Sequence, residues 1–224
     1  MSIFREALEL ARKDIVTEIR ARDALPSAIA LGATALLVVA LAIGPDVERL
    51  RSLAPALVGV VLAFATITLA DRLDAVDRAD DAFVALWLVL EDPRAILIGR
   101  VISLTASLFV LELGLWVSAS LLLDVELTAA TVVLVPVALL SSLSAASVAA
   151  LVMTLVGTTP QRTVLAPTLL LPLLVPTLLS GVQAASAVLA GSGPLVLWAG
   201  VSGAEALLFV GVGLLTYREA AKPA

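Results

Sequence analysis

Six long apolar stretches dominate the chain, and the short segments between them hold most of its charged residues. Each stretch is long enough to cross the roughly 30 Å hydrocarbon core of a bilayer as a helix. They lie near residues 26–44, 53–70, 97–123, 128–156, 163–189 and 194–216. The pattern predicts an all-α, polytopic membrane protein whose 224 residues form a single transmembrane domain with six membrane-spanning helices.

The composition agrees with this class and excludes several others. Hydrophobic residues make up 61% of the chain, charged residues 15%, and the mean hydropathy is +1.10, whereas a soluble domain is about half apolar and a quarter charged. The chain has no cysteine and no histidine, so it lacks thiolate chemistry and the commonest metal ligand and general base. No phosphate-binding loop or hydrolase motif occurs. We therefore expect no catalytic residue, no metal site, no directly bound cofactor and no nucleic-acid partner.

The basic residues predict the orientation in the membrane. Lys and Arg near span ends favour the cytoplasmic side. One side holds twelve of them, which are Arg5, Arg12, Lys13, Arg20, Arg22, Arg72, Arg78, Arg94, Arg100, Arg162, Arg218 and Lys222. The other side holds Arg49 and Arg51. We expect a multi-pass protein of the cell membrane with both termini cytoplasmic, including the tail at 217–224.

The segment before the first span, 1–25, has helical spacing of its own. Its apolar residues recur at Phe4, Leu8, Ala11, Ile15 and Ile19, with charges between them. This periodicity predicts an amphipathic helix, and a basic-flanked helix of this kind lies in the membrane interface. The alternative is a solvated charged leader.

The loop at 71–96 is longer than a simple turn needs. A stripe at helical spacing runs through Leu73, Val76, Phe83, Leu86, Trp87 and Leu90, with Asp74, Arg78 and Asp81 opposite. This predicts an amphipathic coupling helix over 71–95 that docks a cytoplasmic partner. The alternative is a helix that lies on lipid, which the acidic residues of this segment disfavour. The candidate docking residues are Arg78, Asp80, Asp81, Phe83, Leu86 and Trp87.

Two acidic residues, Glu112 and Glu205, fall inside predicted spans. An intramembrane acid is a functional hypothesis by default, because its charge is costly there. The alternative is a neutral carboxyl that hydrogen-bonds a neighbouring helix.

The fourth span is rich in small residues, namely Ser141, Ser142, Ser144, Ala145, Ser147 and Ala149. Small residues let helices approach closely, so this span is predicted to pack tightly, inside the bundle or between subunits.

Three prolines, Pro167, Pro172 and Pro176, interrupt the fifth span. Each removes a backbone donor and crowds the carbonyl four residues earlier. Thr163, Thr168 and Thr177 are near enough in sequence to help satisfy the freed groups. The prolines predict a bent helix, which is either a static kink that shapes packing or a hinge that responds to a partner.

Three segments in this order and spacing resemble the haem exporter protein B family, the permease-like subunit of the cytochrome c maturation ABC complex. They are AIGPDVERLRSLAPALVGV, LADRLDAVDRADDAFVALWLV and LVGTTPQRTVLAPTLLLPLLVP. The matching positions are Ala54-Pro55, Asp71-Arg72-Leu73 with Asp77 and Asp80, and Leu171-Pro172-Leu173 through Pro176.

The resemblance implies a type-2 ABC exporter-like permease. A separate cytoplasmic ATPase subunit would bind ATP and dock on the 71–96 loop, and a membrane partner would handle haem with its histidines. The complex would export haem or release a haem-loaded chaperone for attachment to apocytochrome c. The chain would pair with itself or with the partner subunit. Two other hypotheses remain: a type-2 ABC permease for another substrate, and a membrane scaffold without a transport role.

Overall fold

The computed structural model describes residues 3–21, 24–78, 86–87, 89–126, 128–156, 159 and 161–221. Within these residues the chain is almost entirely helical and has no strand. The named helices are α1 (Ile3–Ala21), α2 (Ala24–Ile43), α3 (Val47–Arg78), α5 (Arg94–Leu122), the 3-10 helix η2 (Ala129–Val133), α6 (Leu134–Val156), α7 (Arg162–Leu189) and α8 (Leu195–Ala220). Six of them, α2, α3 and α5 to α8, are long and apolar enough to cross a membrane. The predicted all-α membrane fold is confirmed.

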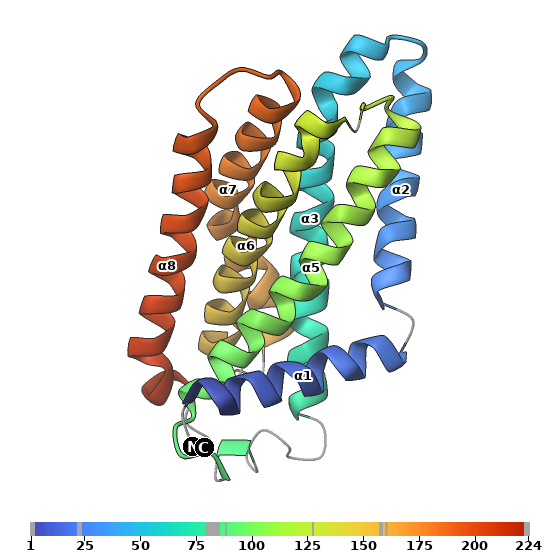
Figure 1. The fold of residues 1–224 in the computed structure, drawn as a ribbon. Helices are drawn as coiled ribbons and strands as arrows, with labels where there is room; N and C mark the ends of the chain where they lie inside the picture. Colours follow the sequence, from blue (N-terminus) through green and yellow to red (C-terminus); the bar gives the residue numbers. More distant parts are fainter. Residues whose placement is uncertain are drawn as a thin grey trace.

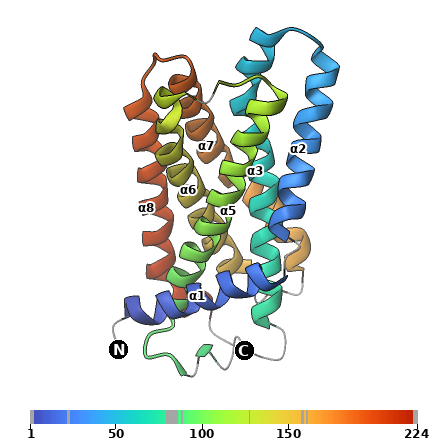
Figure 2. The same ribbon diagram turned by 45° about the vertical axis from the view of Figure 1, so that its right-hand side comes forward.

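The six spans run alternately up and down, and α1 lies across one end of the bundle (Figures 1 and 2). The C-terminal ends of α3, α6 and α8 lie beside α1, which we call the α1 end. At the opposite end, Arg51 of α3 donates to the Asp124 carbonyl at 2.7 Å and pairs with the carboxylates of Asp124 and Glu126, each at 2.9 Å. The alternation agrees with six crossings; which end faces the cytoplasm stays a prediction.

Helix α6 is the centre of the bundle, with α5, α7, α8 and α3 packed around it. The spans of α6 and α5 are 61% and 67% buried, against 11% for α2 and 17% for α8 at the periphery. The small residues of the fourth span are buried, including Ser142, Ser144 and Ala149 at 0% exposure. The predicted close packing is therefore internal to the subunit.

Helix α1 confirms the predicted N-terminal helix and rests on α5. Ala7 and Ala11 face α5 and are buried, while Phe4 and Ile19 are 61% and 64% exposed. Gly99 of α5 makes this crossing close, since a Cβ there would stand 2.9 Å from the Ala7 carbonyl oxygen. The outward apolar side chains are those that an interfacial helix buries in lipid.

The prediction of one helix over 71–95 is wrong for the residues that the structure describes. Residues 71–78 are the last two turns of α3, and residues 90–93 are not helical. Asp74, expected on the solvated side, is 1% exposed. The physical reason is that Asp74 continues the buried face of α3, four residues after Ala70, and has ionic partners inside the bundle.

We predict that Gly99→Ala lowers the free energy of unfolding by about 1–3 kcal/mol, because the new methyl group meets backbone atoms of α1 that cannot rotate away. Equilibrium unfolding in mixed detergent micelles measures this. The matched control is Gly200→Ala, where a Cβ has no neighbour within 4 Å. Equal stability of the two variants would show that α1 is not seated on α5.

Candidate functional site

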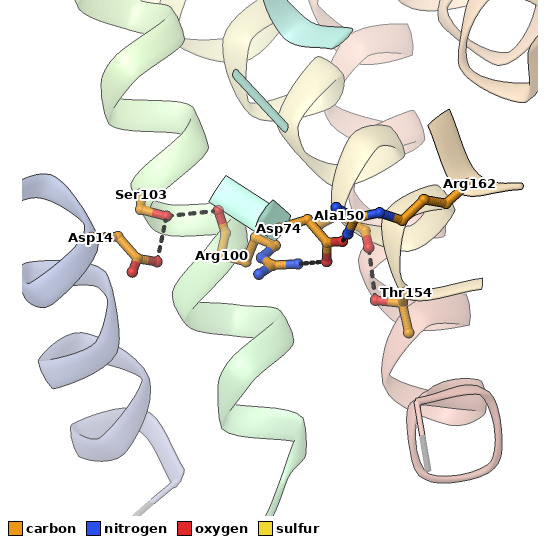
Figure 3. A network of polar contacts seen from close by, with 7 residues as sticks. All are labelled: Asp14, Asp74, Arg100, Ser103, Ala150, Thr154 and Arg162. Carbon is orange, nitrogen blue, oxygen red and sulfur yellow. Dashed lines mark hydrogen bonds and ion pairs between the residues drawn. The ribbon is translucent and has the colours of Figure 1, made fainter. Parts of the chain in front are cut away.

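A buried ionic cluster lies at the α1 end and joins three spans. Asp74 of α3 accepts a hydrogen bond from Arg100 Nη1 of α5 at 2.9 Å, and its other carboxylate oxygen accepts one from Arg162 Nη1 of α7. The side chains of Asp74 and Arg100 are 2% and 6% exposed, and that of Arg162 is 25% exposed. Figure 3 shows the carboxylate held between the two guanidinium groups. We call these three residues the Asp74 cluster.

The carboxylate of Asp74 stabilises the charges of both arginines. Hydrogen bonds between ionised groups are about twice as strong as neutral ones. Removing one member of a buried ion pair costs more than the pair contributes, because the other charge stays buried without compensation. Arg100 therefore depends on Asp74 more than Arg162 does, since Arg162 has access to solvent. The cluster fixes the ends of α3, α5 and α7 relative to one another.

Further polar contacts connect α1 and α8 to the same end. Ser103 of α5 donates to Asp14 of α1 at 3.3 Å (Figure 3). Arg218 at the end of α8 is 3.5 Å from Asp92, just before α5. The side chains of Glu6, Asp14 and Glu18 are buried, whereas Phe4, Leu8 and Ile19 are exposed, so polar contacts help to hold this helix against the spans.

The predicted docking residues are only partly visible. Asp80, Asp81 and Phe83 lie outside the described residues, and Arg78 is the last residue of α3. Leu86 and Trp87 are half-buried and pack against the cluster that contains Ile96, Leu97, Val101 and Tyr217. The rings of Trp87 and Tyr217 are stacked with centroids 6.0 Å apart. Trp87 therefore fastens this segment to α8, and its role toward a partner stays a prediction.

One exposed residue beside Trp87 was not singled out from the sequence. Val89 is 82% exposed at the α1 end, while Leu90 packs inward with Leu86. Among the described residues between α3 and α5, Val89 is an exposed apolar side chain that another protein can reach. Position within a helical stripe does not identify it, because the segment is not one continuous helix.

The two intramembrane acids lie in polar contacts around α6. Glu112 of α5 accepts hydrogen bonds from Ser141 at 2.9 and 2.8 Å and from Ser142 at 3.0 Å. Glu205 of α8 accepts one from Ser144 at 2.9 Å. A small cavity of about 10 Å³ adjoins Glu112 and Ser141, which is room for about one water molecule. Both acids hydrogen-bond a neighbouring helix, as one of the two hypotheses requires, and a transport role stays a prediction.

Hydroxyl groups extend these contacts to α7. Ser144 is 3.3 Å from Thr177, and Ser180 is 2.8 Å from Ser202 of α8. Thr177 is buried and faces α6 through this contact. Thr168 donates to the Val164 carbonyl at 2.7 Å, which is not a group that the prolines free.

The three prolines do not end α7, which is assigned as one helix over Arg162–Leu189. Pro167 is half-buried, whereas Pro172 and Pro176 are exposed on the outside of the bundle. Their missing donors leave the carbonyls of Thr163, Thr168 and Pro172 without the usual helical partner. The middle of α7 therefore has fewer backbone hydrogen bonds than the other spans, and whether it moves stays a prediction.

The sequence analysis missed the Asp74 cluster. It placed Arg100 and Arg162 at loop edges and Asp74 on a solvated face. A signal was present: Leu62, Thr66, Ala70 and Asp74 follow at four-residue steps, and all four are buried. Extending the apolar face of the span by one more turn would have placed Asp74 inside, where an arginine partner is required.

We predict that Asp74→Asn lowers the free energy of unfolding by about 3 kcal/mol, since the buried Arg100 loses its ion pair with the Asp74 carboxylate. The same unfolding titration measures it. The control is Asp71→Asn, a half-buried carboxylate one turn earlier in the same helix, with an expected change within about 0.5 kcal/mol. A stable Asp74→Asn variant would contradict the assigned role of the cluster.

We predict that Glu112→Gln changes stability by less than about 1 kcal/mol, because the amide oxygen still accepts from the serines. Glu112→Leu should cost about 1–2 kcal/mol, since the Ser142 hydroxyl is left buried without its acceptor. Adding Ser142→Ala to Glu112→Leu should restore part of that loss. Unfolding titrations of the four proteins test this, and a failure of Ser142→Ala to compensate would exclude the pairing.

The family model described as CcmB protein matches residues 5–222, which is almost the whole chain. Comparison with curated proteins gives no significant match. The matched range includes α1 from residue 5 onward, all six spans and every residue of the Asp74 cluster. The chain therefore belongs to the CcmB protein family, the haem exporter protein B family, and is a membrane subunit of the haem exporter type.

Proposed function

We propose that this chain is the permease-like subunit of an ATP-driven complex for cytochrome c maturation, and that ATP is hydrolysed on a separate subunit. The family match over residues 5–222 is the observation that carries the proposal. The sequence supports the division of labour, because it has no nucleotide-binding motif and no histidine to ligate haem. Haem is then a substrate of the complex, and a second membrane subunit supplies the haem ligands.

The ATPase docks at the α1 end, where the exposed Val89 lies next to the inward-facing Trp87. Closure of the ATPase presses on this segment, and the stacked rings of Trp87 and Tyr217 pass the force to α8. The Asp74 cluster passes it to α3, α5 and α7 together, because the three helix ends share one carboxylate. These helices of the bundle then move together.

We predict that Val89→Glu reduces the amount of ATPase that co-purifies with the chain by about tenfold. The reason is that burying a valine in an interface contributes about 1.5 kcal/mol, and a carboxylate reverses this. The measurement is affinity purification in mild detergent with subunits quantified by mass spectrometry, alongside the content of c-type cytochromes in the cells.

The matched control is Val196→Glu, an equally exposed valine at 85% exposure at the opposite end of the bundle. ATPase binding should be unchanged in this variant. Normal ATPase recovery with Val89→Glu would remove the docking assignment. A deletion strain with normal c-type cytochromes would instead favour a permease for another substrate, and ATP turnover indifferent to changes in the spans would favour a scaffold.

A further inference from the structure

An apolar groove runs along the outside of the bundle between α2 and α3. Its volume is about 530 Å³, within the range of ligand pockets. The α3 side includes Val60, Phe64, Thr68 and Arg72, at successive four-residue steps. Four residues are about one helical turn, so the stripe extends for about 18 Å along the span. The groove is thus elongated along the axis of α3.

The groove exists because α2 rests mainly on α5. Gly32 and Gly114 allow this close approach, since a Cβ at either position would meet side chains of the facing helix: Leu115 at 2.4 Å from Gly32, and Ile29 at 3.0 Å from Gly114. The outer face of α3 stays uncovered, with Phe64 61% exposed. These are features of two packed helices and do not require another protein to form.

A single positive charge marks one end of the groove. The Arg72 side chain is 35% exposed, and its ion-pair contact among the described residues is Glu18 of α1, at 3.9 Å. That distance is the outer limit of an ion pair, so most of the five guanidinium donors remain available. The Thr68 hydroxyl donates to the Phe64 carbonyl at 2.9 Å, so the wall above Arg72 is apolar.

We propose that this groove is a binding site for one anionic phospholipid of the surrounding bilayer. The phosphate is held by Arg72 at the α1 end, and one acyl chain lies along Val60, Phe64 and Ala35. The position of Arg72 supports a phospholipid as the ligand. Helix α1 lies across the bundle at the same end with apolar side chains outward, and an interfacial helix of this kind lies at the depth of the headgroups. Basic pockets between membrane helices bind anionic headgroups in this way. The site does not depend on the proposed transport role.

The test is lipid retention. The full-length protein is reconstituted in nanodiscs of phosphatidylethanolamine and phosphatidylglycerol, re-extracted in mild detergent, and the phospholipid retained per chain is measured by mass spectrometry. Arg72→Gln should lower retained phosphatidylglycerol about fivefold, the factor that one basic residue contributes toward anionic lipid. Arg72→Lys should keep part of it. Arg49→Gln, an exposed arginine near the opposite end of α3, should have no effect.

Three further variants distinguish binding in the groove from binding to general surface charge. Ala35→Leu fills the groove without changing any charge and should also reduce retention, whereas Ala204→Leu on the exposed side of α8 should not. Glu18→Gln should increase retention, because it removes the competing carboxylate. Unchanged phosphatidylglycerol in both Arg72→Gln and Ala35→Leu would overturn the proposal. So would a wild-type groove that retains added porphyrin in place of phospholipid.

Discussion

The carboxylate of Asp74 is the contact on which the α1 end of the molecule depends. It lies inside the bundle with an arginine on each side, one from α5 and one from α7. Three helix ends that start far apart in the sequence are therefore held by one side chain. The same end carries α1 and the Trp87–Tyr217 stack.

A second constraint acts in the middle of the bundle, where lipid offers no hydrogen-bond partner. Polar side chains there must pair with each other, and they do so around α6. Its serine hydroxyl groups donate hydrogen bonds to Glu112 of α5 on one side and to Glu205 of α8 on another. Small side chains thus have two uses in this helix: they permit close packing, and their hydroxyl groups donate hydrogen bonds to acids of the neighbouring helices.

The sequence predicts the spans well because their signal is length and hydropathy, and both are local. It predicts α1 by periodicity for the same reason. It does not place Asp74, because the residue follows an apolar span and precedes an acidic loop, so local composition suggests solvent. Only the register of α3 relative to α5 and α7 shows that two arginines are within reach. Trp87 is a similar case: an aromatic residue in a loop suggests a partner, yet its ring stacks on Tyr217 of the same chain.

Helix α7 is held by polar contacts toward both ends and lacks backbone donors in between, and this difference decides where it can bend. At the α1 end, α7 is fixed through Arg162 to Asp74. Between Pro167 and Pro176 the same helix lacks backbone donors, and Pro172 and Pro176 face away from the bundle. Beyond them, Ser180 again bonds to α8. If the proposed ATPase acts at the α1 end, its force would be carried by this fixed joint and would deform α7 where its own hydrogen bonds are fewest. The proposal that a separate ATPase drives the subunit therefore places the bend between Pro167 and Pro176.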